Sequence, residues 1–303
     1  MVVRDLVGRG PNYPVVRWPG DARLAVSIVV HFQAGAERSV LDGDDDTESA
    51  DGSSAVEGAV SEGKRRDLQI ESLFEYGPRR GFWRLIECFS RHEVKVTFFA
   101  AGLALERNPV AAAEIVARGH EVAGHGYRWI PHATMSRDEE RAQIARAVEA
   151  IKVTTGERPA GWHSRSPSLH TRELLLEHGF LYDSDSYGDD LPYMVDVEGR
   201  RFLTIPHTMD ATDARYWTTP WLAGFTNPND FFSVMQATFE RLYAEGEHHP
   251  RLMSIGVHPR ISGRPSRARQ IERFIRYAKE FPGVWFAQRV EIARWWLEHG
   301  PDR

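Results

Sequence analysis

Six short clusters of histidine, carboxylate, arginine and aromatic residues form the part of the sequence best suited to chemistry. Histidine exchanges a proton near neutral pH, and neighbouring carboxylates and arginines can orient it or bind a polar substrate. Such residue sets are typical of sites that activate water for hydrolysis. The clusters are HFQAGAE (31–37), GHEVAGHGYRW (119–129), WHSRSPS (162–168), YDSDSYGDDLPY (182–193), IPHTMDATDARYW (205–217) and IGVHPR (255–260).

Taken one at a time, each cluster has an ordinary structural explanation. A single histidine at a strand end is usually satisfied by hydrogen bonds, and an acidic run such as the one around Asp183 and Asp189 usually forms a solvated turn. The functional interpretation gains weight because all six clusters coincide with the ends of predicted strands.

His120 and His125 are the pair that suggests zinc, and their spacing argues against it. Two ligands on one helix face are three or four residues apart, whereas these two are five apart. On a strand, an odd spacing places them on opposite faces, so we expect His120 to be structural and His125 to face a site. The sequence offers no obvious second and third ligand beside His125, and we expect neither a metal nor a cofactor.

The clusters lie within a regular alternation of predicted strands and helices. Leu24 to His31 is the first strand, because it is β-branched and almost continuously apolar. Ser136 and Glu139 form a capping box that predicts a helix to about Thr155. The other predicted helices cover 79–91, 109–118, 171–178, 230–245, 266–280 and 290–299. Eight apolar runs separated by helices predict a parallel sheet, and a closed or partly closed α/β barrel best fits that number.

Nothing in the sequence divides this barrel, so residues 1–303 are predicted to form a single domain. Residues 37–64 are acidic and rich in Gly and Ser, and we expect a surface excursion there. A solvated loop is the simple interpretation, and a lid or an oligomer contact is the functional one.

Composition excludes several classes of protein. The chain has 43 acidic and 38 basic residues, a net charge of −5, and therefore no basic footprint for nucleic acid. The single cysteine, Cys88, cannot form an internal disulfide. The sequence shows neither an apolar run long enough for a membrane span nor a signal peptide, so we expect a cytoplasmic protein. The partner we expect is a small-molecule substrate, with neither nucleic acid nor membrane.

Five segments together resemble the motifs of the polysaccharide deacetylase superfamily: KVTFFAAG, GHEVAGHGYRW, WHSRSPS, YDSDSYGDDLPY and MSIGVHPR. Within it, the chain is most similar to the metal-independent allantoinase and cyclic imide hydrolase branch, through ERSVLDGD, ESLFEYGPRRGFWRL, IPHTMDATDARY and RVEIARWW. The resemblance runs from about Gly10 to the C-terminus. It implies a distorted (β/α)7-type barrel and a homo-oligomer, a dimer or a tetramer.

The resemblance also implies that the family's metal site is altered in this chain. The family's Phe-Asp-Asp-Gly motif matches residues 32–35, which puts Gln33 at the position of the catalytic base and Ala34 at that of a metal-binding carboxylate. The family's His-x-x-x-His pair matches His125 and Trp129, and an indole offers no lone pair to a metal. A metal-independent mechanism is therefore expected. The missing acids of the first motif favour a cyclic amide other than allantoin, or a loss of activity.

By the same resemblance, His258 matches a late catalytic histidine and is expected to act as general acid or base. Asp185, which matches the fourth motif, or else Asp190, is expected to orient it. Glu37 is a reserve candidate for the base.

The remaining candidates are expected to bind substrate. Arg165 matches the third-motif arginine and would clamp a carbonyl or orient a carboxylate. His125 would hold substrate or water, with Gln33 beside it, and Trp129 would form a wall for a flat ring. Arg260 would bind an anion or pair with an acid.

These expectations combine in a metal-independent hydrolase that cleaves a non-peptide C–N bond in a small cyclic amide such as a ureide or an imide. The first alternative is an N-deacetylase of an acetylated sugar or a related linear amide. The second, from another class, is a catalytically silent barrel used for binding.

Overall fold

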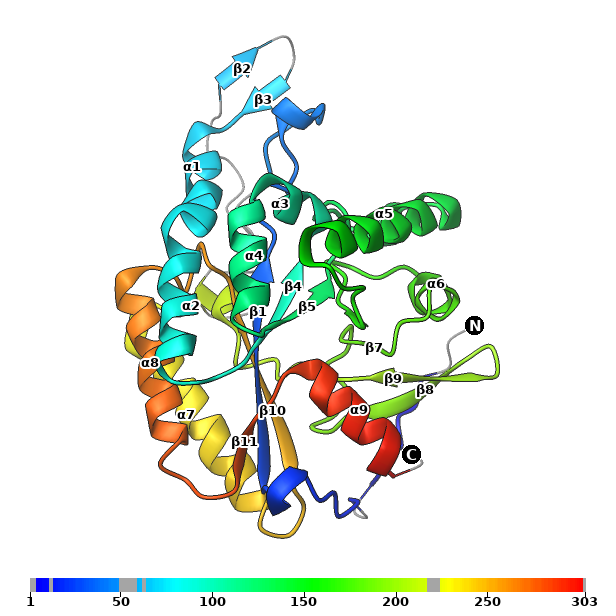
Figure 1. Cartoon of the computed structure of the whole chain (residues 1–303), viewed down its shortest axis with the longest axis vertical. Helices are drawn as coiled ribbons and strands as arrows, with labels where there is room; N and C mark the ends of the chain where they lie inside the picture. Colours follow the sequence, from blue (N-terminus) through cyan, green and yellow to red (C-terminus); the bar gives the residue numbers. More distant parts are fainter. Residues whose placement is uncertain (1–3, 11–12, 49–58, 62–63, 217–223, 302–303) are drawn as a thin grey trace.

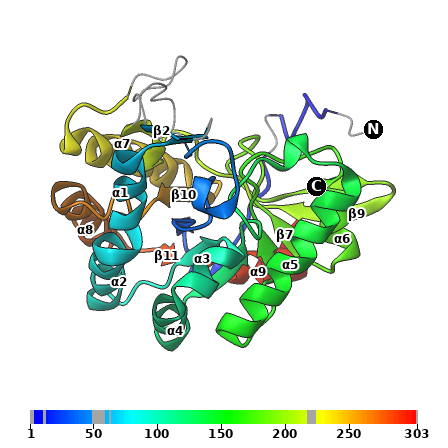
Figure 2. The same ribbon diagram turned by 90° about the horizontal axis from the view of Figure 1, so that it is seen from above.

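The computed structural model describes residues 4–10, 13–48, 59–61, 64–216 and 224–301. A curved sheet lies at its centre and helices surround it (Figures 1 and 2). The strands of the sheet are β1 (Leu24–Phe32), β4 (Thr97–Ala100), β5 (Glu121–Gly124), β6 (Gly161–Trp162), β7 (Tyr182–Asp183), β8 (Tyr193–Val197), β9 (Arg200–Thr204), β10 (Arg251–Val257) and β11 (Val284–Phe286).

The order of the strands confirms the predicted α/β barrel as a curled, mainly parallel half-barrel. The order is β10-β1-β4-β5-β6-β7-β9-β8, and β11 pairs with β1 as well. All nine residues of β1 are buried, as its unbroken apolar sequence predicts for the centre of a parallel sheet. Because the paired neighbours of β1 run parallel to it, their carboxyl ends lie at the same edge and bring the loops that follow them together.

The helices follow the strands in sequence and cover the outside of the sheet (Figure 2). The predicted capping box is confirmed: Ser136 accepts the Glu139 N–H, and the Glu139 carboxylate accepts the Ser136 N–H at 2.8 Å. The helices are α1 (Leu68–Tyr76), α2 (Phe82–Arg91), α3 (Gly102–Arg107), α4 (Pro109–Ala117), α5 (Arg137–Thr155), α6 (Thr171–Glu177), α7 (Pro228–Glu245), α8 (Pro265–Ala278) and α9 (Arg289–His299).

The helix predicted for 79–91 corresponds to α2 and the end of the turn before it, and the helical backbone leading into it already begins at Leu68. Gly77 and Pro78 indicate a break, but the chain passes from α1 to α2 through a π-helical turn, η3 (Gly77–Gly81). Gly81 packs on the backbone of Pro259, where an added Cβ would lie 1.9 Å from the carbonyl oxygen. The glycine therefore permits a close approach between the turn and the loop after β10.

The acidic excursion is partly built into the fold. Residues 49–58 and 62–63 lie outside the described residues, as does Trp217 of the fifth cluster. The described part contains the 3-10 turn η2 (Val40–Asp42) and the small hairpin of β2 (Ala59–Ser61) and β3 (Lys64–Arg66). Glu48 is only 1% exposed, so the prediction of a simple solvated loop is wrong for this residue.

The sheet departs from strict strand–helix alternation at one side, where β8 and β9 form an antiparallel hairpin. The chain after β9 then runs beside β10, with an isolated parallel bridge between Thr212 and Gly256. Among the described residues, no helix is both long and apolar enough to cross a membrane.

Candidate active site

Five imidazoles meet at the carboxyl ends of the strands. His31 lies near the end of β1, and the others follow β5, β6, β9 and β10 in turn: His125, His163, His207 and His258. The ring of His31 stacks on that of His258 with 4.5 Å between their centres, and His125 stacks on His163 at 5.1 Å. His207 closes the group, with its ring centre 4.7 Å from that of His163. The strand ends therefore bring together side chains from five separate loops.

His125 is held by contacts at both ring nitrogens. Its Nδ1–H donates to the carbonyl oxygen of His163 at 2.6 Å, and Nε2 lies 3.2 Å from Gln33 Oε1. Both side chains are almost fully buried. His120, by contrast, accepts the Val96 N–H at 3.2 Å away from this group, as expected for a structural histidine, and the site-facing role of His125 stays a prediction.

His258 forms a buried pair with Asp213. Its Nδ1–H donates to Asp213 Oδ1 at 2.6 Å, and Asp213 Oδ2 accepts the backbone N–H groups of His258 at 2.7 Å and Ser262 at 3.2 Å. The carboxylate is inaccessible to solvent. The sequence analysis missed Asp213 as the partner, although the residue lies in the fifth cluster.

The two aspartates predicted to orient His258 lie elsewhere, and that prediction is wrong. Asp185 Oδ1 is 2.9 Å from His163 Nδ1 and also accepts the Ser164 N–H at 2.7 Å. Asp190 is exposed, and its carbonyl oxygen accepts the N–H of Leu252 at the start of β10. His258 follows the other end of that strand, about 20 Å away at the usual rise per residue.

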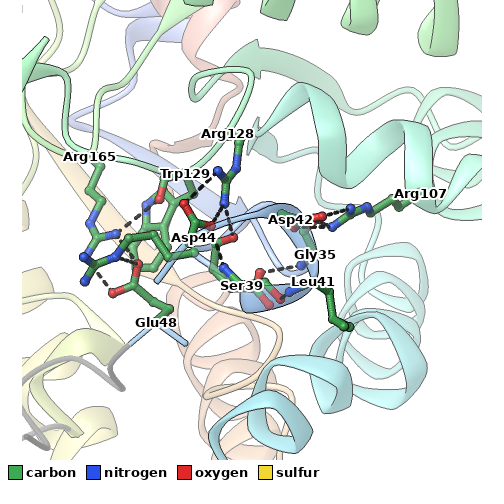
Figure 3. A network of polar contacts seen from close by, with 12 residues as sticks. Gly35, Ser39, Leu41, Asp42, Asp44, Glu48, Arg107, Arg128, Trp129 and Arg165 are labelled. Atoms are coloured by element: carbon green, nitrogen blue, oxygen red, sulfur yellow. Dashed lines mark hydrogen bonds and ion pairs between the residues drawn. The ribbon is translucent and has the colours of Figure 1, made fainter. Parts of the chain in front are cut away.

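Arg165 is engaged by protein rather than exposed for substrate. Its guanidinium donates to both carboxylate oxygens of Glu48, at 2.6 and 3.1 Å, and lies 4.0 Å from the ring centre of Trp129 (Figure 3). Arg260 lies over the same indole at 5.4 Å and over Phe74 at 4.6 Å. Trp129 is thus buried beneath two cationic side chains. Of the two roles predicted for Arg165, it is the contact with a carboxylate that the structure shows, and the sequence analysis did not single out Glu48 as that carboxylate.

Glu37 lies in the turn after β1, where its carboxylate accepts the Gly35 N–H at 2.5 Å. Burial raises the pKa of Glu37, and the backbone N–H groups and Arg260 oppose that rise. Within the described part of the chain, no hydrogen bond or ion pair joins this carboxylate to an imidazole. Its role as a reserve base therefore stays a prediction.

The environment keeps much of the imidazole cluster uncharged. Burial holds the pKa values of His31, His125 and His207 well below the ordinary range, and the other imidazoles, with Arg289 beside His207, lower them further because a second positive charge there would be repelled. A neutral imidazole carries a lone pair on one nitrogen, so the cluster presents proton acceptors to the space between the rings. Such a site can accept hydrogen bonds from water or from a polar substrate.

The fold and this site define an α/β-barrel hydrolase whose histidines and carboxylates come from the ends of the strands. The chain belongs to the polysaccharide deacetylase family. Residues 62–177 match the family model described as polysaccharide deacetylase. Over 319 residues the chain is 35% identical to a putative polysaccharide deacetylase of Schizosaccharomyces pombe, with 98% of each chain covered.

Two solved structures resemble the whole chain. One is a probable polysaccharide deacetylase from Pseudomonas aeruginosa PAO1, 43% identical with a TM-score of 0.89, covering 98% of this chain and 99% of that one. The other is PuuE allantoinase, 40% identical with a TM-score of 0.88, covering 98% of both chains. Family members of these kinds are hydrolases of C–N bonds other than peptide bonds, and this protein is a hydrolase of that class.

The metal position implied by the family resemblance does not fit this chain. It would use the side chains at Ala34, His125 and Trp129, of which only the imidazole can donate a lone pair. The Arg165 guanidinium lies 4.0 Å from the Trp129 ring centre, so a fixed positive charge sits beside that position. We therefore assign no catalytic step to a metal held there.

Proposed function

We propose that this protein hydrolyses a small cyclic amide, a ureide or an imide, with His258 as the general base. The observation that carries the proposal is the buried pair of His258 and Asp213, with 2.6 Å between Nδ1 and Oδ1. The similarity to PuuE allantoinase over the full length of both chains supports a ring substrate.

In the proposed reaction, water attacks the ring carbonyl while His258 takes its proton. Asp213 accepts the Nδ1–H, which leaves the lone pair of the neutral imidazole on Nε2, where it can accept the proton of water. The carboxylate then stabilises the imidazolium that forms. When the tetrahedral intermediate collapses, the ring C–N bond breaks and the imidazolium returns the proton to the leaving nitrogen. The products are an acid and an amide or ureido group on one opened chain.

Gln33 supports the binding of a carbonyl group in this site. Its amide NH₂ is buried and has no partner among the described residues. A buried donor without a partner is costly, and a substrate carbonyl or its oxyanion would satisfy it. We assign Gln33 to substrate binding, together with His125.

Removal of an acetyl group from a sugar or another linear amide is the second candidate. It is favoured by the names of two relatives, the putative polysaccharide deacetylase of Schizosaccharomyces pombe and the probable polysaccharide deacetylase from Pseudomonas aeruginosa PAO1. The same base could serve that reaction, because attack of water on an amide carbonyl is common to both. The substrate assay therefore separates the two candidates.

The test is a panel of allantoin, hydantoins, cyclic imides and N-acetylated sugars, assayed with and without a chelator. We expect ring opening of at least one cyclic substrate and a loss of turnover of about 10²-fold or more in His258→Ala. The expected homo-oligomer also stays a prediction, and light scattering of the same preparation measures it.

Two results would count against the proposal. Turnover of acetylated sugars alone would establish the deacetylase candidate. Unchanged turnover of a ring substrate in His258→Ala, with the variant folded by circular dichroism, would remove the assigned base.

A further inference from the structure

We propose that His31, His125 and His163 form a binding site for a divalent transition metal of the zinc, cobalt and nickel type. One ring nitrogen from each residue lies within 4.8 Å of the other two. The site is separate from the position that the family resemblance implies, because it takes only His125 from that set. It goes beyond the proposed hydrolysis but shares His125 with the residues assigned there to substrate binding, and the titration below tests it without substrate.

The sequence analysis expected no ligands beside His125, and the fold supplies two of them. His31 comes from the end of β1 and His163 follows β6, so the three imidazoles lie far apart in the sequence and converge only through the sheet. Imidazole suits zinc, cobalt and nickel, and three histidines with an open position are an established ligand set for zinc. The two further imidazoles were not obvious in the sequence because they lie far from His125 along the chain.

The surroundings of His125 match those of a metal ligand. Ligating histidines usually turn their second nitrogen toward a backbone carbonyl or a carboxylate, which fixes the ring and its tautomer. His125 Nδ1 donates to the His163 carbonyl oxygen at 2.6 Å, which leaves Nε2 for a ligand bond. His163 Nδ1 lies 2.9 Å from Asp185 Oδ1 but makes no hydrogen bond among the described residues, so a carboxylate faces this ring without fixing its tautomer.

The contact between His125 and Gln33 can be satisfied in two ways, by a cation or by rotation of the amide. Because His125 Nδ1 donates to a carbonyl, its Nε2 carries the lone pair, and that lone pair faces Gln33 Oε1 at 3.2 Å. Two acceptors that face each other repel unless a positive centre lies between them. A rotated amide group would instead present its NH₂ to the nitrogen, and the experiment below separates these possibilities.

Binding requires a small contraction of the cluster. A zinc–nitrogen bond of about 2.0 Å in tetrahedral geometry sets the nitrogens about 3.3 Å apart, so from the widest spacing of 4.8 Å the rings must close by roughly 1.5 Å.

The experiment is a titration of the full chain, stripped with a chelator and dialysed, with Zn²⁺ by calorimetry and with Co²⁺ by visible absorption. We expect one equivalent of metal and the absorption of a nitrogen-ligated Co²⁺ ion. His31→Asn and His163→Asn should each weaken binding by at least about tenfold, and Asp185→Asn by about tenfold through the orientation of His163. Gln33→Glu should strengthen it by adding an anionic oxygen.

Two matched variants serve as controls. His207→Asn removes an imidazole of the same cluster that is not among the three ligands, and His92→Gln removes one member of a second group, Cys88, His92 and Glu272. Both should bind Zn²⁺ as the unaltered chain does. An absence of saturable binding would overturn the proposal. It would also be overturned if His31→Asn and His163→Asn bound Zn²⁺ with the affinity of the unaltered chain. No substrate enters the titration, so its failure is distinct from a failure of the proposed hydrolysis.

Discussion

The tautomer of His258 determines whether it can act as a base, and one carboxylate sets that tautomer. Asp213 accepts the Nδ1–H, and two backbone N–H groups hold the carboxylate in turn. Replacing the carboxylate by an amide would leave the geometry nearly intact. The amide can present its NH₂ to Nδ1, however, and would then move the ring proton to Nε2.

We therefore predict that Asp213→Asn lowers kcat/KM on the ring substrate by about 10²- to 10⁴-fold, the range usual for a general base. Steady-state kinetics measure the effect. Asp190→Asn is the matched control, because this residue is exposed and lies at the opposite end of β10. If Asp213→Asn kept full kcat/KM, His258 would not be the base.

Single residues were predictable from the sequence only where a motif or a strand end marks them. His125 and His258 stand at such positions, and both lie in the cluster. The partner of His258 could not be chosen, because 45 residues separate it from Asp213 and several aspartates in two acidic segments were equally plausible. His31 and His163 were visible as strand-end histidines, but only the curvature of the sheet brings them together.

At the scale of elements, three arginines hold the segment after β1 over the strand ends. Arg107 pairs with Asp42, Arg128 with Asp44 and Arg165 with Glu48 (Figure 3). The arginines follow β4, β5 and β6, so the segment is attached across three successive strands. The acidic composition that suggested a solvated loop thus also supplies ion-pair partners.

The three pairs should differ in their contribution to stability because their exposure differs. Glu48 is buried, and although burial would raise its pKa, Arg165 and Arg38 hold the pKa below the ordinary value. We predict that Glu48→Gln lowers the free energy of unfolding by about 3 to 5 kcal/mol, because Arg165 loses its partner. Asp42→Asn should cost about 1 kcal/mol or less, since Arg107 is 45% exposed. Urea unfolding compares the two, and equal effects would contradict the prediction.

Helix α5 offers a pH-dependent test through Glu140. Burial alone would raise its pKa, but hydrogen bonds with His132, Ser168 and Thr171 outweigh it and hold the pKa below 4.5. A depressed carboxyl pKa adds stability above the ordinary value, and this stability is lost as pH falls through the depressed pKa.

We predict that Glu140→Gln lowers the free energy of unfolding by about 1 to 3 kcal/mol at pH 7. The difference from the unaltered chain should shrink as pH falls below the ordinary carboxyl range. Melting temperatures of both chains measured from neutral to acidic pH provide the test. A difference that is independent of pH would exclude the ionised carboxylate as the cause.

The elements themselves were largely predictable, because capping signals and apolar periodicity act locally. The capping box at Ser136 and the buried strand from Leu24 are examples. The π-helical turn at Gly77–Gly81 was not predictable. Its glycines serve a contact with Pro259, nearly two hundred residues away, and the local sequence favours a break.

At the scale of the whole molecule, the alternation of strands and helices predicted the half-barrel. It did not predict the region between β9 and β10, here called the seam. In the described part of the chain, β9 and β10 do not pair directly in the sheet. Arg289, at the start of α9, is fully buried and bridges this region. Its guanidinium donates to the Ile205 carbonyl oxygen at 2.8 Å and to Ser254 Oγ at 2.6 Å. It also donates to Ser184 Oγ at 3.1 Å. Burial lowers its pKa to about 10, which still leaves it charged at neutral pH.

We predict that Arg289→Met lowers the free energy of unfolding by about 3 kcal/mol or more, because several buried acceptors lose their donor at once. Arg294→Met is the matched control, since Arg294 lies on the exposed side of the same helix and should change stability little. Hydrogen exchange should locate the loss at the seam, with faster exchange in β10 and in the segment after β9 than in β4 and β5. If both variants unfold at the same urea concentration, the seam is held by the packing of β10 rather than by Arg289.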